Sequence, residues 1–500
     1  MLKNFSIKTT WNSNFKRAWI LCVASLVGPG IEYGLQAADL EPTSISLVKP
    51  ERVIIQEAIA SHVKQMFAEM SDDGREGYRV LTENAYLQPD FDSAVLDKLQ
   101  EGNWELPFTD TEPAAKRDET LRAFGISMRH DDPSKPLQYV VKQSPESPEQ
   151  LPNQSFVMNC FACHGGNTLG ATFPGAPNTT YALESFTEQV RRIKLKNKFK
   201  LGHMDLGSMF MPLGSTVGSS NAVMFGVALM SFRDKDLNVL TNAPAEMTHH
   251  DMDAPPWWHF SRKSHMYIDG FADKGHKGLM QFMLVRQNGP EKFRAWASDF
   301  EKVYQFISQV KPPKYPLSID QTLAAKGQSV FNDNCASCHG TYGSTPEYPE
   351  LNIPIDEIGT DRVRWESLTP AYRKHYGDSW FADYGNQKTY DSPEGYTAPP
   401  LDGIWASAPY FHNGSVPTLW HVLHAADRPE VWKRTEQGLD TKRIGFTFGS
   451  VAEVPKGLSG FDRRWYFDTR ALGKSAAGHL YPEGLTEDDK SALLEYLKTL

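Results

Sequence analysis

The sequence CFACH at residues 160–164 recurs as CASCH at residues 335–339, and these two copies organise the chain. Two cysteines at this spacing can add to the two vinyl groups of one haem, and the histidine that follows can bind its iron. A zinc ion shared by two C-x-x-C pairs is the alternative, but such a site needs no histidine after the second cysteine in both copies. The sequence therefore predicts two covalently bound c-type haems. Their attachment residues are Cys160, Cys163 and His164 for the first haem, and Cys335, Cys338 and His339 for the second.

The composition is that of an ordinary globular protein, with 40% hydrophobic and 23% charged residues among 500. The formal net charge of -9 gives no general attraction to nucleic acid or to an anionic membrane. The chain also contains no dinucleotide-binding fingerprint and no phosphate-binding loop. We therefore expect no nucleic-acid partner.

The first 38 residues have the pattern of an export signal. Positive charge is scattered over residues 3–17 without an acidic residue, and the apolar run 18–27 that follows is too short to span a membrane. The small residues Ala37 and Ala38 offer a cleavage point, and Cys22 would leave with the signal. We expect a periplasmic or secreted protein with no membrane span after cleavage; an uncleaved anchor is the alternative.

The strong hydrophobic patterns are helical. Helices are predicted over residues 291–310, over 320–332 and after Thr486, and the last two should cross beside the second haem as in cytochromes c. We predict a mostly α protein with long loops: a signal peptide at 1–38, an N-terminal helical region at 39–150, and haem domains at 151–310 and 317–500. In the N-terminal region, one helix face should be buried by Ile55, Ile59, Val63, Met66 and Met70.

A further helix is predicted over residues 183–200, and it ends in a basic run. The simplest interpretation of that run is a solvated helix face. A docking patch for an acidic redox partner and a counter-charge for haem propionates are the alternatives.

The sequence does not fix the sixth ligand of either haem iron. The last methionine is Met283, so the second haem can take no thioether ligand from its own domain. His479, which follows Gly478 in a loop before the final helix, is the favoured ligand, and a bis-histidine haem would have a low potential. For the first haem, Met211 is a candidate ligand, with core packing as its alternative role. The full set of candidates for the second haem is His375, His412, His421, His424 and His479.

Residues 247–278 are dense in histidine and aromatic side chains, but no pair has convincing ligand spacing for a non-haem metal. Trp257 and Trp258, with Phe271, could form the wall of a haem pocket or relay electrons. Core packing is the alternative role of these rings.

The sequences APPLDGIW at residues 398–405, PYFHNGS at 409–415 and PTL at 417–419 resemble the C-terminal signature of bacterial di-haem cytochrome c peroxidases. They resemble the di-haem rubber oxygenases and their relatives more closely, as do Gly478-His479 and the segment PWW at 256–258. The similarity runs from about residue 156 to the C-terminus. The chain is shorter than we expect of a rubber oxygenase, and no feature specifies a polyisoprene channel.

The resemblance implies that the haem on His164 is the reactive one, with its distal side open or occupied by dioxygen and a pocket that includes Trp257, Trp258 and Phe271. It also implies that the haem on His339, with His479 as its other ligand, transfers electrons. A calcium ion between the domains, as in some relatives, is a further possible cofactor.

We weigh three functions. The favoured one is an oxidoreductase that activates dioxygen or peroxide at the first haem. A peroxide-reducing enzyme is less favoured, because it usually needs a methionine-ligated donor haem. The third is a non-catalytic electron carrier with both haems six-coordinate. We expect a redox partner protein or a small-molecule oxidant; the substrate is not readable from the sequence.

Overall fold

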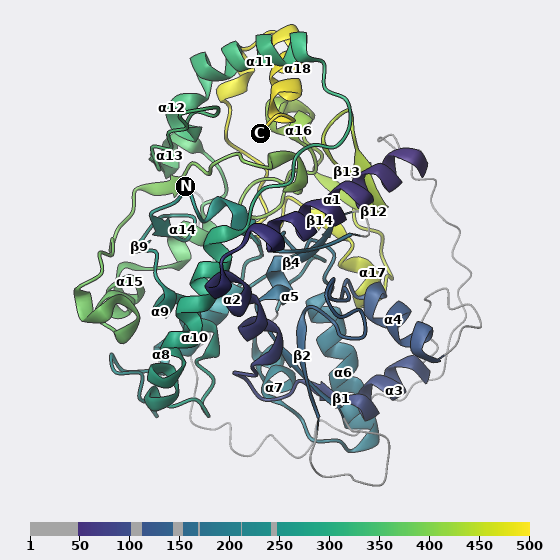
Figure 1. The fold of residues 1–500 in the computed structure, drawn as a ribbon, viewed down its shortest axis with the longest axis vertical. Helices are drawn as coiled ribbons and strands as arrows, with labels where there is room; N and C mark the ends of the chain where they lie inside the picture. The colour runs from purple at the N-terminus through teal and green to yellow at the C-terminus, as the bar shows by residue number, and fades with distance from the viewer. Residues whose placement is uncertain (1–48, 102–112, 144–153, 169–170, 212, 242–247) are drawn as a thin grey trace, which may run out of the picture. The chain divides into compact units, whose positions relative to one another are not determined.

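The computed structural model describes residues 49–101, 113–143, 154–168, 171–211, 213–241 and 248–500 (Figure 1). The predicted signal peptide lies outside these ranges. The helices are α1 (Lys49–Glu69), α2 (Asp72–Glu83), α3 (Ser93–Glu101), α4 (Pro113–Ala123), α5 (Phe161–His164), α6 (Leu183–Asn197), α7 (His203–Phe210), α8 (Ala222–Ser231), α9 (His276–Leu279), α10 (Pro290–Gln309), α11 (Gln321–Asn334), α12 (Ala336–His339), α13 (Ile355–Ile358), α14 (Val363–Ser367), α15 (Pro370–Gly377), α16 (Leu419–Leu423), α17 (Gly460–Arg463) and α18 (Glu487–Leu497). The strands are β1 (Phe91–Asp92), β2 (Tyr139–Gln143), β3 (Gln154–Met158), β4 (Gly165–Thr168), β5 (Ala171–Pro174), β6 (Ser219–Ser220), β7 (Met252–Asp253), β8 (His265–Met266), β9 (Ala272–Asp273), β10 (Asn352–Pro354), β11 (Gly395–Thr397), β12 (Val431–Asp440), β13 (Gly445–Ser450) and β14 (Tyr466–Asp468).

The prediction of a mostly α fold needs correction, because the described residues are 45% helical and 14% strand. The longest strand, β12, pairs with β13 and β14 in an antiparallel sheet. Consecutive side chains of β12 are buried, with Val431 1% and Trp432 0% exposed. At these two residues β12 is buried on both faces, so this part of the strand lacks the alternation that identifies strands in a sequence. Most other strands have two to five residues, too few for a pattern.

The predicted helices are present. α10 buries the stripe expected for residues 291–310. α1 buries four of the five residues predicted for its inner face, and the fifth, Met70, is buried directly after the helix. α11 and α18 begin at side-chain caps, where Asp320 accepts from Thr322 N and Thr486 accepts from Asp489 N. The two helices cross closely at Gly327, where an added Cβ would lie 1.9 Å from the carbonyl oxygen of Ala492. The predicted crossing of the first and last helices of the second haem region is therefore confirmed.

The predicted helix over residues 183–200 is α6, and its basic run has two environments. Most of its lysines are exposed. Lys194 is 4% exposed, and its Nζ lies 2.5 Å from Asp205 Oδ2 in α7. One lysine of the run therefore joins α6 to α7.

The N-terminal region is hydrogen-bonded to the first haem motif. β3, which leads into Cys160, pairs with both β1 and β2. α2 packs against α10 so closely that an added Cβ at Gly77 would lie 2.0 Å from the carbonyl oxygen of Lys302. The described residues between 49 and 500 belong to one compact unit, and the boundaries at 150 and 310–317 stay predictions.

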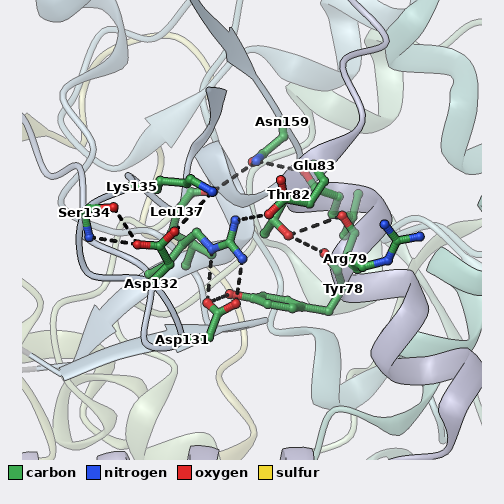
Figure 2. A network of polar contacts seen from close by, with 12 residues as sticks. Tyr78, Arg79, Thr82, Glu83, Asp131, Asp132, Ser134, Lys135, Leu137 and Asn159 are labelled. Atoms are coloured by element: carbon green, nitrogen blue, oxygen red, sulfur yellow. Dashed lines mark hydrogen bonds and ion pairs between the residues drawn. The ribbon is translucent and has the colours of Figure 1, made fainter. Parts of the chain in front are cut away.

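Asn159 connects these elements to the haem motif (Figure 2). Its Nδ2 donates to the carbonyl oxygens of Leu81 in α2 and Leu137 before β2, at 3.0 Å each, and its Oδ1 accepts from Phe161 N at 2.9 Å. The guanidinium of Arg129 binds Glu83 in α2 and Asp131. α2 and β2 thus position the residue that immediately precedes Cys160.

Candidate haem sites

His164 is held at the end of α5 by one backbone contact. Its Nδ1 lies 3.1 Å from the carbonyl oxygen of Pro255. Because a carbonyl can only accept, Nδ1 must carry the hydrogen, which leaves the lone pair on Nε2. Burial lowers the pKa of His164 to about 4, so the ring is neutral near pH 7. A neutral imidazole with a free Nε2 is the form that binds iron.

His339 has the same arrangement at the end of α12. Its Nδ1 lies 2.8 Å from the carbonyl oxygen of Pro399, and burial lowers its pKa. Sequence reasoning did not identify Pro255 and Pro399 as functional residues. The sequence does contain a pattern that could have identified them, because Ala-Pro-Pro follows each haem motif, at residues 254–256 and 398–400. The two motifs therefore share both the histidine and the carbonyl group that orients it.

The four cysteines of the motifs are half-buried thiols, and none of them forms a disulfide. Burial raises the pKa of Cys160 to about 12 and that of Cys335 to about 11, so both are neutral thiols near pH 7. Within the described ranges, no three His, Cys, Asp or Glu side chains lie close enough together to hold a metal ion. Among the described residues, the cysteines therefore do not converge on a shared zinc site, and no acidic cluster is placed to hold a calcium ion.

His479 faces His339. Their ring centroids are 6.2 Å apart, with an angle of 62° between the ring planes. Two imidazoles bound to opposite sides of one metal ion at about 2 Å have ring centres about 6 Å apart. The spacing of this pair therefore fits a single six-coordinate iron between the rings.

The local backbone fixes the position of His479. Gly478 and His479 both have left-handed φ values, 79° and 51°, and the N–H of His479 donates to Ile358 O at 2.7 Å. Burial lowers the pKa of His479 to about 3, and its buried Nδ1 has no hydrogen-bond partner. A strained residue whose ring is neutral and lacks a partner is consistent with a ligand position.

The other candidate histidines have different surroundings. His421 Nδ1 lies 2.6 Å from Thr418 Oγ1, His424 contacts Trp420 O and Glu487, and His375 contacts Met230 O. The ring of His412 packs on Tyr396, with centroids 4.5 Å apart. In the part of the chain that the structure describes, His479 is the candidate whose ring contacts His339.

The two tryptophans connect the motifs. Trp257 stacks on His164 with ring centroids 4.9 Å apart and an interplanar angle of 22°. The next residue, Trp258, donates from Nε1 to the carbonyl oxygen of Asp402 at 2.7 Å. Asp402 lies three residues after Pro399, the acceptor for His339. Residues 255–258 therefore extend from the first haem histidine to the segment that holds the second.

Phe271 lies in a different environment from the tryptophans. Its ring stacks on Tyr267 at 4.5 Å and meets Tyr376 edge-on at 5.3 Å. The three rings help to line a largely apolar pocket. Among the described ring contacts, none joins Phe271 directly to Trp257 or Trp258, although all three side chains belong to the same hydrophobic core.

Met211 is buried directly after α7, with 7% of its surface exposed. Its backbone N–H donates to Gly207 O at 3.0 Å. The following residue, Pro212, lies outside the described residues. Ligation of the first haem by Met211 stays a prediction.

Comparison with known proteins identifies the chemistry of the second motif. A cytochrome c family profile matches residues 324–410, and a profile described as RoxA-like, cytochrome c-like matches residues 395–433. The first range contains Cys335, Cys338 and His339; the first haem motif lies outside both ranges.

Two curated relatives from Sinorhizobium fredii are also similar. The uncharacterized protein y4iM is 30% identical over 39% of this chain and 53% of its own length. The uncharacterized protein y4iJ is 30% identical over 38% of this chain and 41% of its own length. The chain thus spans about half the length of these relatives or less. The profile matches, with the geometry of His339, support a c-type cytochrome that carries covalently bound haem.

Proposed function

We propose that this chain is an exported di-haem c-type cytochrome and a haem-dependent oxidoreductase. The haem on His164 is the site that activates dioxygen or peroxide, and the haem on His339 and His479 transfers electrons. Bound haem supplies the redox-active iron in both sites. The observation that carries the proposal is the contrast between the two histidines: His339 has a second imidazole 6.2 Å away, whereas the described ring contact of His164 is with Trp257.

The equivalent roles of Pro255 and Pro399 support a haem at the first motif as well as the second. Each carbonyl fixes its histidine in the Nδ1–H tautomer. A histidine with a purely structural role does not need its Nε2 kept free of hydrogen. Because both motifs have the same carbonyl contact at Nδ1, we favour the same cofactor at both sites.

Trp257 and Trp258 are proposed as the electron relay between the haems. Stacking places Trp257 against His164, and the hydrogen bond from Trp258 to Asp402 continues towards Pro399 and His339. Phe271 is proposed as a pocket residue, on the resemblance and on the apolar pocket that it lines. A periplasmic or secreted location and a redox partner protein or small-molecule oxidant belong to the same proposal.

The test is absorption and electron paramagnetic resonance spectroscopy of the purified holoprotein, after its covalent haem has been counted. We expect two haems per chain, one low-spin and one high-spin, with the high-spin haem binding carbon monoxide when reduced. Replacement of the second imidazole in His479→Ala should create a second haem that binds carbon monoxide. His412→Ala is the matched variant, and it should leave one such haem.

Two fully low-spin irons that ignore carbon monoxide would contradict the oxidoreductase. They would leave an electron carrier, in which Met211 would be the first residue to test as a ligand. A second carbon monoxide-binding haem in His412→Ala instead of His479→Ala would reassign the ligand.

A further inference from the structure

Two buried arginines share one carboxylate. Arg364 in α14 places Nη1 3.3 Å from Asp269 Oδ2, and Arg373 in α15 places Nη2 2.7 Å from the same oxygen. The side chains of Arg364, Arg373 and Asp269 are 1%, 2% and 0% exposed. A single carboxylate therefore balances two guanidinium groups, and one positive charge is left over. A buried charge without a counter-ion is strongly unfavourable, so one more anion is expected at this place.

The unused hydrogen-bond donors show where that anion belongs. Nε and Nη2 of Arg364 and Nη1 of Arg373 are buried and have no partner among the described residues. On Arg364, Nε and Nη2 form the free edge of the guanidinium, because Nη1 is taken by Asp269. This edge presents two parallel N–H groups, the arrangement that binds a carboxylate through both of its oxygens.

Another arginine shows that the chain can satisfy a buried guanidinium with its own backbone. Arg233 is 1% exposed, as is Arg364. Its Nη1 donates to Leu237 O and Asn288 O, and its Nη2 to Leu284 O and Val285 O, at 2.6–2.8 Å. The contrast indicates that the free edge of Arg364 is reserved for a group that the polypeptide does not supply.

Arg364 is tied to both sides of the second candidate haem site. It lies six residues after Ile358, whose carbonyl oxygen accepts from the N–H of His479. The next residue, Trp365, donates its backbone N–H to Tyr396 Oη at 3.1 Å, and Tyr396 precedes Pro399 by three residues. The segments that carry His479 and Pro399 therefore meet near Arg364.

We propose that Arg364 binds a propionate carboxylate of the haem held by His339 and His479, and that Asp269 and Arg373 position its guanidinium. This inference rests on the proposed second haem. A haem carries two propionates, which supply the anion and the pair of acceptor oxygens that the site lacks. Arg364 and Arg373 thus provide the counter-charge for the haem propionates from buried positions. The sequence offers the basic run at residues 191–200 as one alternative source of that charge.

The experiment uses the holoprotein with Arg364→Gln and Arg364→Lys, and Arg362→Gln as the matched control. Arg362 lies two residues away, is 49% exposed and pairs with Asp356 and Glu366. Loss of a positive charge near the iron favours the ferric form, so Arg364→Gln should lower the reduction equilibrium constant of the low-spin haem about tenfold. Resonance Raman spectra should show a shifted propionate bending band for that haem. Arg364→Lys should restore the potential but not the band, because an ammonium cannot bind both oxygens in the same way.

Asp269→Asn is the second variant, and it acts in the opposite direction. It leaves two buried positive charges, so it should raise the reduction equilibrium constant of the same haem. The proposal is overturned if two haems are attached and Arg364→Gln leaves the potential and the propionate band unchanged, or if Arg362→Gln shifts the potential equally. A wild-type potential that depends on added inorganic phosphate would identify a free anion instead, and would also overturn it. Failure of the proposed function is a separate result, since it appears in the wild-type protein as a haem count of one or as two low-spin irons that ignore carbon monoxide.

Discussion

At the scale of single residues, two proline carbonyl oxygens decide how His164 and His339 present their rings. Proline fits poorly into helices and sheets, so the carbonyl of a Pro-Pro segment is often free of a backbone ladder and can accept from a side chain. Pro255 and Pro399 each use that freedom on a haem-motif histidine. Three residues after Pro255, Trp258 donates to the backbone carbonyl of Asp402, so the orientation of one histidine is connected to the segment that orients the other.

Trp258→Phe tests this connection. The variant loses the indole hydrogen bond to Asp402 O, and electron transfer between the haems should become slower by about tenfold. Trp432→Phe is the matched control, because Trp432 is equally buried and donates to Ser415 O at 3.1 Å. The measurement is the redistribution of electrons after photolysis of carbon monoxide from the half-reduced protein. Equal rates in the wild type and Trp258→Phe would exclude Trp258 from the path.

At the scale of elements, the crossing of α11 and α18 frames the second haem motif. Each helix begins at a side-chain cap, and α11 leads directly into Cys335. Gly327 allows the crossing because any side chain there would meet the backbone of α18. Backbone cannot move aside as a flexible side chain can, so the close approach depends on the absence of a Cβ.

Gly327→Ala should therefore destabilise the protein by about 2 kcal/mol or more, although alanine normally favours a helix over glycine by about 1 kcal/mol. The measurement is denaturant unfolding followed by circular dichroism and by the haem absorption of the second site. Gly484→Ala is the control, since nothing lies within 4 Å of the Cβ it would add. A Gly327→Ala variant as stable as the wild type would mean that the two helices separate without cost.

At the scale of the whole molecule, sequence periodicity predicted what lies close in the chain. The buried stripes of α1 and α10 and the cap of α18 are local features, and each was found as expected. The partners of His164 and His339 are 91 and 60 residues away, so spacing rules could not find them. His479 was favoured from its place before the last helix, whereas its distance from His339 required the fold.

The N-terminal region shows the same limit. Its helical pattern gave no indication that β1 and β2 would pair with β3 beside the first motif. Long-range strand pairing and buried charge pairs such as Arg364–Asp269 depend on residues brought together only by folding. The N-terminal region therefore contributes to stability mainly through its contacts with the rest of the molecule.

One such contact makes the stability of the whole molecule depend on pH. Burial opposes ionisation of Asp131, but hydrogen bonds from Arg129 and Tyr78 outweigh it and lower the pKa of this carboxyl to about 2. The unfolded chain has a pKa of about 3.9 at aspartate, so folding is favoured by the ionised form. This contribution is fully present above about pH 4 and is lost as the pH falls towards 2.

Asp131→Asn should therefore lower the melting temperature at neutral pH, and its difference from the wild type should shrink between about pH 4 and pH 2. Asp72→Asn is the control, because the side chain of Asp72 is 98% exposed. Melting curves recorded by circular dichroism at several pH values measure the effect. A difference that stays constant down to pH 2 would show that the neutral carboxyl serves as well as the ionised one. The Arg129–Asp131 ion pair would then add nothing to the contact between α2 and residues 129–131, which would rest on the Arg129–Glu83 ion pair and the hydrogen bond from Tyr78 to Asp131.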